Sequence, residues 1–393
     1  MPSSIRKALN ELPISLDETY ERALEWIPKE KRQHAHRLFQ CLVVAFRPLR
    51  VEELAEVFAI EFEADAGPSL KEGWRPDSPE DAVLSACSTL IAVIEDKGSK
   101  IVQFSHFSVK EYLTSDRLRI SEMGNIRQYH IPLDAAHTIL ARACLTVLLH
   151  LDENVDKERL KTFPLAFYAA EHWVTHAKYE DVASRIQDTM EQLFDPSKGY
   201  LTAWTWICEV GVNGSYRVRP IDTLEERPTR PGRPALYFAV ICGFSGLVNY
   251  LIITHRENVD VDCGIFRTPL YVASLWGLAD VVHVLLQHNA DVNAKTIEDE
   301  TPLHLTTYRW GHARVAQLLL EHGAAVNAQS KYRITPLYRA SRYGHLEVVK
   351  ILLEHGADVH IRGGDDLTPF QVATQNGHAE VAQSLLEHGA EKE

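Results

Sequence analysis

The stretch "TPLYRASRYGHLEVVKILLEHGADVH", from Thr335 to His360, decides the fold of the C-terminal part of this chain. Its apolar residues recur at three- and four-residue spacings, which predicts two short amphipathic helices. Thr335 and Pro336 suit the cap and the first turn of the first helix, and Gly344 allows the backbone to reverse before the second. The stretch contains no obvious reactive group, so we interpret it as a packing unit.

Four related stretches begin at Arg233, Thr268, Thr301 and Thr368, and their turn glycines are Gly243, Gly277, Gly311 and Gly377. Together with Gly344, these glycines follow one another at intervals of 34, 34, 33 and 33 residues. A single helical hairpin of this size cannot bury both of its faces, so neighbouring copies are expected to stack. The sequence therefore predicts an α-solenoid over residues 233–393.

The period and the wording resemble the ankyrin repeat, whose signature opens Thr-Pro-Leu-His and closes Gly-Ala-Asp-Val-Asn. Here "TPLHL" begins at Thr301 and "GADVH" at Gly356, and the resemblance runs from Arg233 to the end of the sequence. It implies about five repeats, of which the first is degenerate and the last has the polar face of a capping repeat. The copy from Thr301 carries one extra residue before its turn glycine and has threonines where the others have a small alanine. We expect a local bulge or an altered helix start there.

In ankyrin repeats the binding surface is normally the concave side, formed by the finger loops and the first helices. The residues just before three of the turn glycines fall on or near that side, and they are large: three are aromatic, two are arginines and one is a leucine. The candidate partner-binding residues are Leu275, Trp276, Arg309, Trp310, Arg342 and Tyr343. Aromatic and arginine side chains in one register are typical of interface hot spots, and the alternative is that they pack between repeats.

The first 120 residues show no repeat but have helical patterns. Apolar stripes predict helices from Leu16 to Ile27, in "EKRQHAHRLFQCLVVAF" and from about Val51 to Ile60. Ser78 then suits the cap of a helix that leads to strands over 90–94 and 101–104, joined by a turn at Lys97 and Gly98. Three helices followed by a β-hairpin are the order of a winged helix.

The segments "IRKALNELPISLDETYERAL", "RPLRVEELAEVFAIE" and "QFSHFSVKEYL" resemble a domain that follows the NTPase core in fungal NACHT–ankyrin proteins, relatives of the NOD-like receptors. That domain is named as a winged helix of the GPI inositol-deacylase type, and the name implies no deacylase activity for it. The resemblance implies a winged-helix domain over residues 1–120, a helical bridge over 121–210 and then the repeats. Glycine and proline between Gly211 and Pro234 predict a linker over 211–232 that acts as a hinge or a protease-sensitive site. The expected fold class is mainly α.

Composition limits the classes of function. The chain of 393 residues has a net charge of −13, which repels nucleic-acid phosphates and anionic lipids. The segment expected to read a DNA groove, from Pro79 to Glu95, contains no lysine or arginine, so we expect no nucleic-acid binding. Six scattered cysteines and the lack of a long apolar run predict a soluble protein of the cytoplasm, with the nucleus as the alternative, reduced thiols and no membrane span.

Motifs for catalysis are absent from the sequence. It has neither the G-x-x-x-x-G-K-[ST] phosphate loop of NTPases nor the G-x-S-x-G elbow of hydrolases. Ser105 and His106 are neighbours, but adjacent residues at a strand-to-helix junction rarely form a triad, and we expect packing or capping. Histidines recur at the same place in three repeats, namely His322, His355 and His388, where they suit the end of a helix rather than a metal. We expect no enzyme activity, cofactor or metal.

The sequence therefore favours a protein–protein interaction module, in which the solenoid recognises a protein partner and the winged-helix half couples or anchors it. The resemblance implies a setting like fungal NOD-like-receptor signalling. One alternative is that the chain is the regulatory half of a nucleotide-driven switch whose NACHT core lies elsewhere. A remote alternative is an unrecognised hydrolase. The partner, the oligomeric state and the direction of signalling are left open by these patterns.

Overall fold

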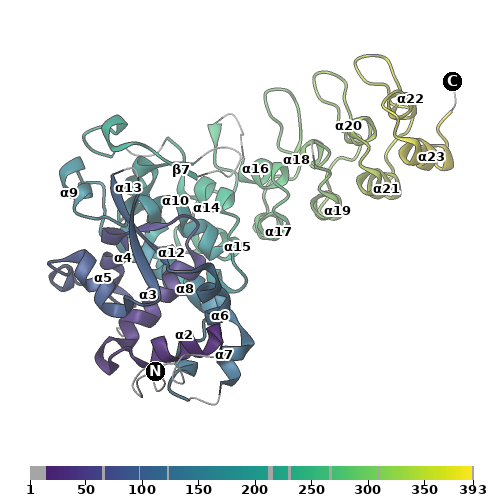
Figure 1. The fold of residues 1–393 in the computed structure, drawn as a ribbon. Helices are drawn as coiled ribbons and strands as arrows, with labels where there is room; N and C mark the ends of the chain where they lie inside the picture. The colour runs from purple at the N-terminus through teal and green to yellow at the C-terminus, as the bar shows by residue number, and fades with distance from the viewer. Residues whose placement is uncertain are drawn as a thin grey trace, which may run out of the picture. The chain divides into compact units, whose positions relative to one another are not determined.

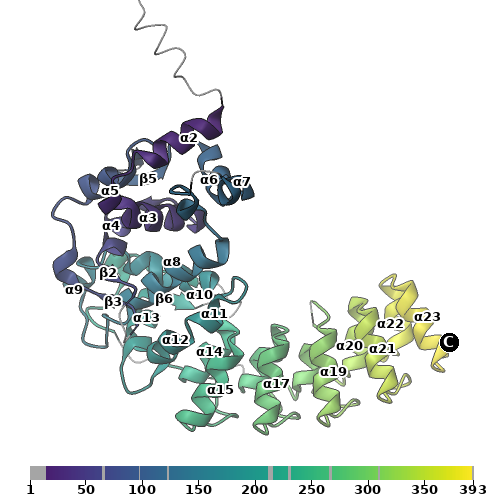
Figure 2. The same cartoon turned by 90° about the horizontal axis from the view of Figure 1, so that it is seen from below.

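The computed structural model describes residues 15–63, 67–96, 98–121, 124–210, 216–228, 232–264, 268–308 and 310–391. By its internal contacts the chain divides into two units. Unit 1 comprises residues 1–209 and 216–230, and unit 2 comprises residues 210–215 and 231–393. Figures 1 and 2 show the path of the chain from purple at the N-terminus to yellow at the C-terminus.

Unit 1 begins with the expected helices followed by a β-hairpin. They are α2 (Leu16–Glu25), α3 (Arg32–Val44), α4 (Val51–Phe58), α5 (Pro79–Cys87), β4 (Ile91–Asp96), β5 (Ser99–Phe104) and α6 (Phe107–Thr114). Ser78 caps α5 as predicted, because its hydroxyl accepts a hydrogen bond of 3.4 Å from the amide of Asp81. The winged-helix prediction is therefore confirmed.

Three further strands are too short for a sequence pattern to show. Strand β1 (Leu49–Arg50) pairs antiparallel with β5, so that the hairpin becomes a three-stranded sheet in the order β1-β5-β4. Strands β2 (Ile60–Glu61) and β3 (Ser69–Leu70) form a separate antiparallel pair. All three are two residues long, and period-2 alternation cannot be recognised over such a length.

More helices complete unit 1. They are α7 (Asp116–Ile120), α8 (Leu133–Leu148), α9 (Lys157–Lys161), α10 (Ala166–Ala177), α11 (Val182–Arg185), α12 (Gln187–Phe194) and α13 (Tyr200–Ile207). Helix α8 packs against α3 of the winged helix and against α10. Trp173 and Trp204 meet edge to face with their ring centroids 5.5 Å apart, and both are fully buried. Because α8 touches both groups of helices, the winged helix and the following helices share one hydrophobic core.

Part of the stretch predicted as a linker has regular structure. Strand β7 (Tyr216–Val218) forms a two-stranded sheet with β6 (Cys208–Val210) and packs against α10. The ring of Tyr216 stacks on Trp204 at a centroid distance of 6.2 Å. Residues 216–218 thus belong to the packing of unit 1, and the expectation of an irregular loop is wrong for them. Residues 211–215 lie outside the described residues.

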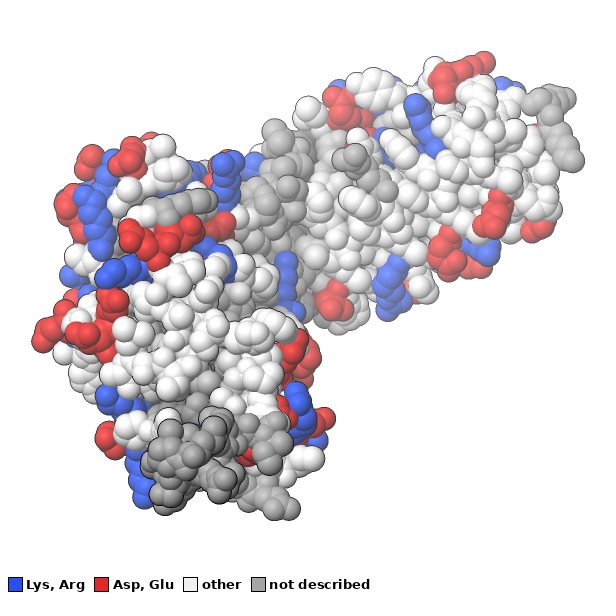
Figure 3. Space-filling view, viewed as in Figure 1, with Lys and Arg blue, Asp and Glu red and all other residues white. Residues whose placement is uncertain are grey.

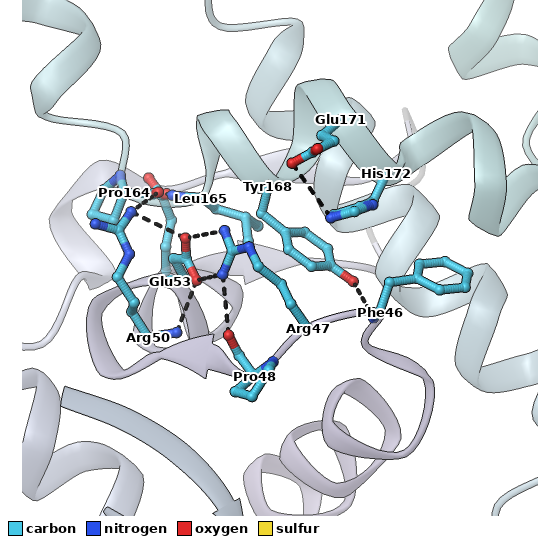
Figure 4. Close-up of polar contacts among 11 residues, drawn as sticks. Phe46, Arg47, Pro48, Arg50, Glu53, Pro164, Leu165, Tyr168, Glu171 and His172 are labelled. Carbon is cyan, nitrogen blue, oxygen red and sulfur yellow. Dashed lines mark hydrogen bonds and ion pairs between the residues drawn. The ribbon is translucent and has the colours of Figure 1, made fainter. Parts of the chain in front are cut away.

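A buried carboxylate joins the winged helix to α10 (Figure 4). Glu53 on α4 is fully buried and accepts two hydrogen bonds from the guanidinium of Arg47, at 2.7 and 2.8 Å. It also accepts the amide of Arg50 at 2.8 Å, and the side chain of Arg50 reaches the carbonyl of Pro164. Burial acts to raise the pKa of Glu53, but hydrogen bonding and the charge of Arg47 lower it below its ordinary value. The ion pair is therefore charged and fully hydrogen-bonded.

A second buried carboxylate makes the same kind of connection. Glu56, one turn further along α4, accepts the amide of Leu165 at 2.7 Å and the side chain of Arg75 at 2.6 Å. Burial raises the pKa of Glu56, and these two partners oppose that shift. Two carboxylates on one helix thus hold the segment that leads into α10.

A chain of neutral polar side chains continues from this network. The amide of Phe46 donates to the hydroxyl of Tyr168 at 3.3 Å, and that hydroxyl lies 2.9 Å from Nε2 of His176. Nδ1 of His176 lies 2.8 Å from Nδ1 of His137. Burial lowers the pKa of His176 and of His137, and with the charge of Arg47 it lowers the pKa of nearby His172 to about 4. The histidines of this cluster are therefore neutral at physiological pH.

Unit 2 consists of ten helices within its described residues, arranged as five hairpins. The first helices are α14 (Ala235–Cys242), α16 (Pro269–Leu275), α18 (Pro302–Leu305), α20 (Pro336–Tyr343) and α22 (Pro369–Gln375). The second helices are α15 (Ser245–Thr254), α17 (Ala279–Gln287), α19 (Ala313–Glu321), α21 (Leu346–Glu354) and α23 (Ala379–Glu387). Each first helix packs against the first helix of the next hairpin, and each second helix packs against the next second helix (Figures 1 and 2). The predicted α-solenoid is confirmed.

The turn glycines are required for two reasons. Gly344 has φ +75°, in the left-handed region, and a Cβ there would lie 2.5 Å from Nδ1 of His378 in the next hairpin. The same histidine places Nε2 3.1 Å from the carbonyl of Arg342. Gly277 and Gly311 are covered in the same way by the histidines of the hairpins that follow them. A side chain at these positions would displace a contact between neighbouring repeats.

Asparagine side chains make further bonds between neighbouring fingers. Oδ1 of Asn293 accepts the amide of Ala325 at 2.8 Å, and Oδ1 of Asn327 accepts the amide of Asp358 at 2.9 Å. These asparagines stand at the end of the repeat signature. Their place in the signature therefore has a direct physical reason, which is to satisfy a backbone donor of the next repeat.

The hairpin from Thr301 departs from the others at the end of its first helix. The start is regular, with Thr301 bonded to the ring of His304, but α18 is four residues long where α20 has eight. The hydroxyls of Thr306 and Thr307 donate to the carbonyls three residues earlier, at 2.8 and 2.6 Å. Side chains of this type compete with the helical backbone bonds. The expectation of an altered helix start is thus corrected: the helix ends early.

We expect Gly344→Ala to destabilise the solenoid more than Gly356→Ala does. Gly356 also has positive φ, at +81°, but nothing lies within 4 Å of its added Cβ, so it is a matched control. The control should lose about 1 kcal/mol of unfolding free energy from backbone strain alone, and Gly344→Ala about 2–3 kcal/mol because His378 must also move. Urea unfolding of the two variants measures both values. Equal losses would show that the histidine contact contributes nothing.

Breaking the buried ion pair should destabilise unit 1 strongly. We expect Glu53→Gln to cost about 2–3 kcal/mol, because it replaces the buried charged acceptor of Arg47 and of the amide of Arg50 by a neutral side chain, although Arg47 itself is only partly buried. Glu158→Gln is the control, since its ion pair with Lys161 at 2.6 Å is exposed and contributes little to stability. Urea unfolding followed by near-ultraviolet circular dichroism of the buried tryptophans reports on unit 1. Similar effects of the two variants would contradict a structural role for the buried pair.

Unit 1 should lose stability as the pH falls from 7 to 5. The folded-state pKa of His172, at about 4, lies below the ordinary value of 6.5, so the unfolded chain takes up protons first. The pKa values of His137 and His176 are also lowered in the folded state, so these residues change the stability of unit 1 in the same direction. We expect the urea midpoint of unit 1 to fall over this range, and to fall less in His172→Gln. The exposed His360→Gln should keep the wild-type pH dependence, and an unchanged fall in His172→Gln would contradict this account.

Candidate partner-binding surface

The residues predicted from the register before each turn glycine differ in exposure. Trp310 is 70 % exposed and Tyr343 is 44 % exposed, whereas Leu275 and Trp276 are half-buried. Arg342 is exposed on the last turn of α20, and Arg309 lies outside the described residues. The register therefore places accessible aromatic side chains in the third and fourth repeats, and less accessible ones in the second.

Contacts between these two repeats fix an aromatic cluster, which consists of Tyr308, Trp310 and Tyr343. The rings of Tyr308 and Tyr343 lie 6.1 Å apart between centroids, and Tyr343 stacks on His345 at 6.0 Å. Nε2 of His345 lies 2.6 Å from the carbonyl of Tyr308. Arg339 lies over the ring of Tyr308 at 5.4 Å and forms an ion pair with Glu300. The two tyrosines of the cluster are thus held by backbone and side-chain contacts, whereas Trp310 is exposed to water.

Three exposed side chains of this region were missed in the sequence. Tyr308 is 42 % exposed, and Ile297 and Tyr332, in the finger loops, are 67 % and 60 % exposed. The early end of α18 turns residues 306–308 out of the helical register, so the repeat alignment could not place Tyr308. The two finger residues could have been predicted as exposed. They are an isoleucine and a tyrosine in largely polar loops that offer no core position for either.

The uncharged character of the surface is visible in Figure 3. On the face of the repeats in that view, most atoms belong to residues that are neither acidic nor basic, and the charged side chains are scattered. Exposed aromatic side chains such as Tyr308, Trp310 and Tyr343 mark sites of protein interaction more often than random surface does.

The residues weighed as catalytic have structural roles in the described geometry. His106 caps α6, with Nδ1 3.3 Å from the amide of Ser108 and 2.5 Å from its hydroxyl. The hydroxyl of Ser105 instead donates to the carbonyl of Thr89 at 3.3 Å. The two neighbours are therefore not hydrogen-bonded to each other, and the capping interpretation of His106 is confirmed.

The recurring histidines end their helices as expected. Nδ1 of His322, His355 and His388 lies 2.8 Å from the carbonyl four residues earlier in each case. Within the ranges that the structure describes, no three histidine, cysteine or acidic side chains gather as a metal site. All six cysteines are buried free thiols. Across the same described segments, no helix is both long and apolar enough to cross a membrane.

Comparison with known protein families agrees with this architecture. Residues 20–123 match the family described as "GPI inositol-deacylase, winged helix domain". Residues 219–296 and 293–363 match "Ankyrin repeats (3 copies)", and residues 365–392 match "Ankyrin repeat". Ankyrin repeats are non-catalytic interaction modules, so these matches indicate that part of the chain binds protein.

A curated relative covers most of the chain. The chain is 31 % identical over 303 residues to "Azaphilone pigments biosynthesis cluster protein L" of Monascus ruber. The alignment includes 72 % of this chain and 61 % of the relative, so the chain spans less than two thirds of the relative's length. Together, the relative and the family matches confirm the recognition made from the sequence: a winged-helix domain of the GPI inositol-deacylase type precedes ankyrin repeats.

Proposed function

We propose that the chain is a non-catalytic recognition protein that binds a protein partner through its third and fourth ankyrin repeats. The observation that supports this most directly is the aromatic cluster of Tyr308, Trp310 and Tyr343: all three side chains are exposed, and contacts between the repeats fix the two tyrosines. Rigid aromatic side chains bind with little loss of conformational freedom, and they dominate many protein interfaces. The predicted residues Arg342, Leu275, Trp276 and Arg309 would contribute to the edge of the same surface.

In this proposal unit 1 anchors or couples the repeats to other components. Its two buried carboxylates, Glu53 and Glu56, tie the winged helix to the following helices, so unit 1 would act as a single body. The proposed setting is cytoplasmic signalling of the fungal NOD-like-receptor type, which rests on the resemblance of the domain combination. Binding of nucleic acid is not part of the proposed function.

The alternative is that the chain is the regulatory half of a nucleotide-driven switch. The winged-helix match supports it, because the resembling domain in NACHT–ankyrin proteins follows an NTPase core. Under this alternative, unit 1 would bind a NACHT-type NTPase, and the repeats would regulate it.

Replacing Trp310 should separate binding from folding. We expect Trp310→Ala to lower partner affinity about tenfold or more, because exposed tryptophans are frequent hot spots, and to leave the melting temperature within about 2 °C of wild type. Ile253→Ala is the matched control, since Ile253 is 59 % exposed on α15 and lies outside the cluster. Quantitative affinity capture from source-organism lysate with the full chain measures retention, and differential scanning fluorimetry measures stability.

The outcomes distinguish the two functions. A protein that is retained by wild type and Ile253→Ala but lost with Trp310→Ala supports recognition by the repeats. Recovery of a NACHT NTPase that survives Trp310→Ala favours the switch alternative. Turnover of ATP or of an ester by the purified chain would contradict the proposal of a non-catalytic protein.

A further inference from the structure

One segment of unit 2 concentrates positive charge in an acidic chain. Residues 331–342, "KYRITPLYRASR", carry four cationic side chains and no carboxylate, although the whole chain has a net charge of −13. They are Lys331, Arg333, Arg339 and Arg342. The segment includes the tip of one finger loop and all of α20 except its last residue, Tyr343. It therefore lies beside the aromatic cluster.

These side chains surround a hollow of about 510 Å³ between two successive fingers. The hollow is lined by Lys331, Tyr332 and Arg333 of one finger, by Tyr338 and Arg342 of α20, and by Asp365 of the next finger. Its volume is within the range of about 300–1,000 Å³ that is typical of ligand pockets. It is open to water, because the three cationic side chains and Tyr332 are exposed.

The charges that face the hollow are not balanced. Arg339 is buried and forms an ion pair with Glu300, but Lys331, Arg333 and Arg342 make no ion pair within 4.0 Å among the described residues. The carboxylate of Asp365 already accepts the hydroxyl of Tyr338 and the amide of Leu367.

On the opposite side, Glu298 of the preceding finger is hydrogen-bonded to Tyr332. The hollow is thus lined by three cations that make no ion pair within 4.0 Å among the described residues. Its one lining carboxylate, Asp365, interacts with the charge of Arg342 and already accepts hydrogen bonds with both oxygens. Its field attracts an anionic group.

We propose that this hollow binds an acidic side chain of an extended peptide segment of the protein partner. Arginine guanidinium groups pair with carboxylates through two parallel hydrogen bonds, and Arg333 and Arg342 both line the hollow. Tyr343 directly follows Arg342, so an apolar side chain next to the acidic one would reach the aromatic cluster. This inference rests on the proposed function and names the chemistry of its partner: an acidic residue close to an aromatic or aliphatic one. A nucleic acid fits less well, since the net charge of −13 repels a polyanion.

The test is selection of a displayed library of random twelve-residue peptides on the full chain. We expect enrichment of peptides with aspartate or glutamate beside an apolar residue. A selected peptide and its asparagine or glutamine counterpart are then compared by fluorescence anisotropy at 50 and 300 mM salt. The acidic form should bind at least tenfold more tightly at low salt, and the difference should shrink at high salt as the charges are screened.

Variants locate the binding. The double substitution Arg333→Gln with Arg342→Gln should lower the affinity for the acidic peptide about tenfold or more and remove its salt dependence. Lys350→Gln is the matched control, because it removes one positive charge from an exposed position on the second helix α21. It should leave binding unchanged, and circular dichroism verifies that all variants are folded.

Other results would overturn the inference, and they separate it from the proposed function. If the selected peptides lack acidic residues but their binding still depends on Trp310, the acidic-peptide site is refuted. The proposed recognition through the aromatic cluster then stands. Peptides that are insensitive to Trp310 and to both arginines would refute both. A failure to enrich any peptide would also refute the acidic-peptide site. So would a labelled single-stranded oligonucleotide that binds more tightly than the acidic peptide and depends on Arg333 and Arg342.

Discussion

The stacking of each helical hairpin on the next is the interaction on which the recognition surface depends. A two-helix unit of about 33 residues has too little interior to fold alone, so its order comes from its neighbours. In this chain the stacking is fixed by more than apolar contact. A histidine of one repeat covers the turn glycine of the repeat before it and bonds a carbonyl there, as His378 does at Gly344. Asparagine side chains then bond the amides of the next finger. These contacts set the spacing at which side chains of successive repeats meet.

The aromatic cluster is a consequence of that spacing. Tyr308 and Tyr343 belong to successive repeats, and they come within 6.1 Å because His345 bonds the carbonyl of Tyr308. The same histidine covers Gly311, so one side chain both closes the repeat interface and places two rings of the surface. Stability and recognition therefore use the same contacts at this place, whereas Trp310 projects into water and can be changed without disturbing the stack.

Unit 1 is held together by a different kind of interaction. Burying Glu53 and Glu56 carries a desolvation cost, and a well-packed apolar core would often be as stable. The carboxylates contribute directional hydrogen bonds, because each accepts them only from donors in fixed places, such as Arg47 and the amide of Leu165. We therefore attribute to them the orientation of the winged helix on the following helices more than the stability of unit 1.

Sequence patterns were sufficient wherever one local rule determined the structure. The repeat period, the glycine turns and the Ser78 cap each depend on a few neighbouring residues, and all three predictions are confirmed. Patterns were insufficient where distant residues decide. The pairing of β1 with β5, the packing of Tyr216 on Trp204 and the polar network around Glu53 and Tyr168 join segments up to 122 residues apart, and no spacing reveals them. The early end of α18 lies between these cases, because its threonines are visible in the sequence but their hydrogen bonds are not.

The same distinction applies to the binding surface. The register before the turn glycines predicts Trp310, Arg342 and Tyr343 as surface residues, and all three are exposed. The register could not predict which of these side chains is the most exposed, since exposure depends on how the next repeat covers each position. The hollow beside them is formed by two fingers and one helix, and only Arg342 of its lining belongs to that register.

A solenoid repeats its backbone but varies its exposed side chains from one repeat to the next. The specificity of such a protein is therefore expected at positions where a repeat departs from the common pattern, and the run of cations from Lys331 to Arg342 is the strongest departure of charge in the described repeats.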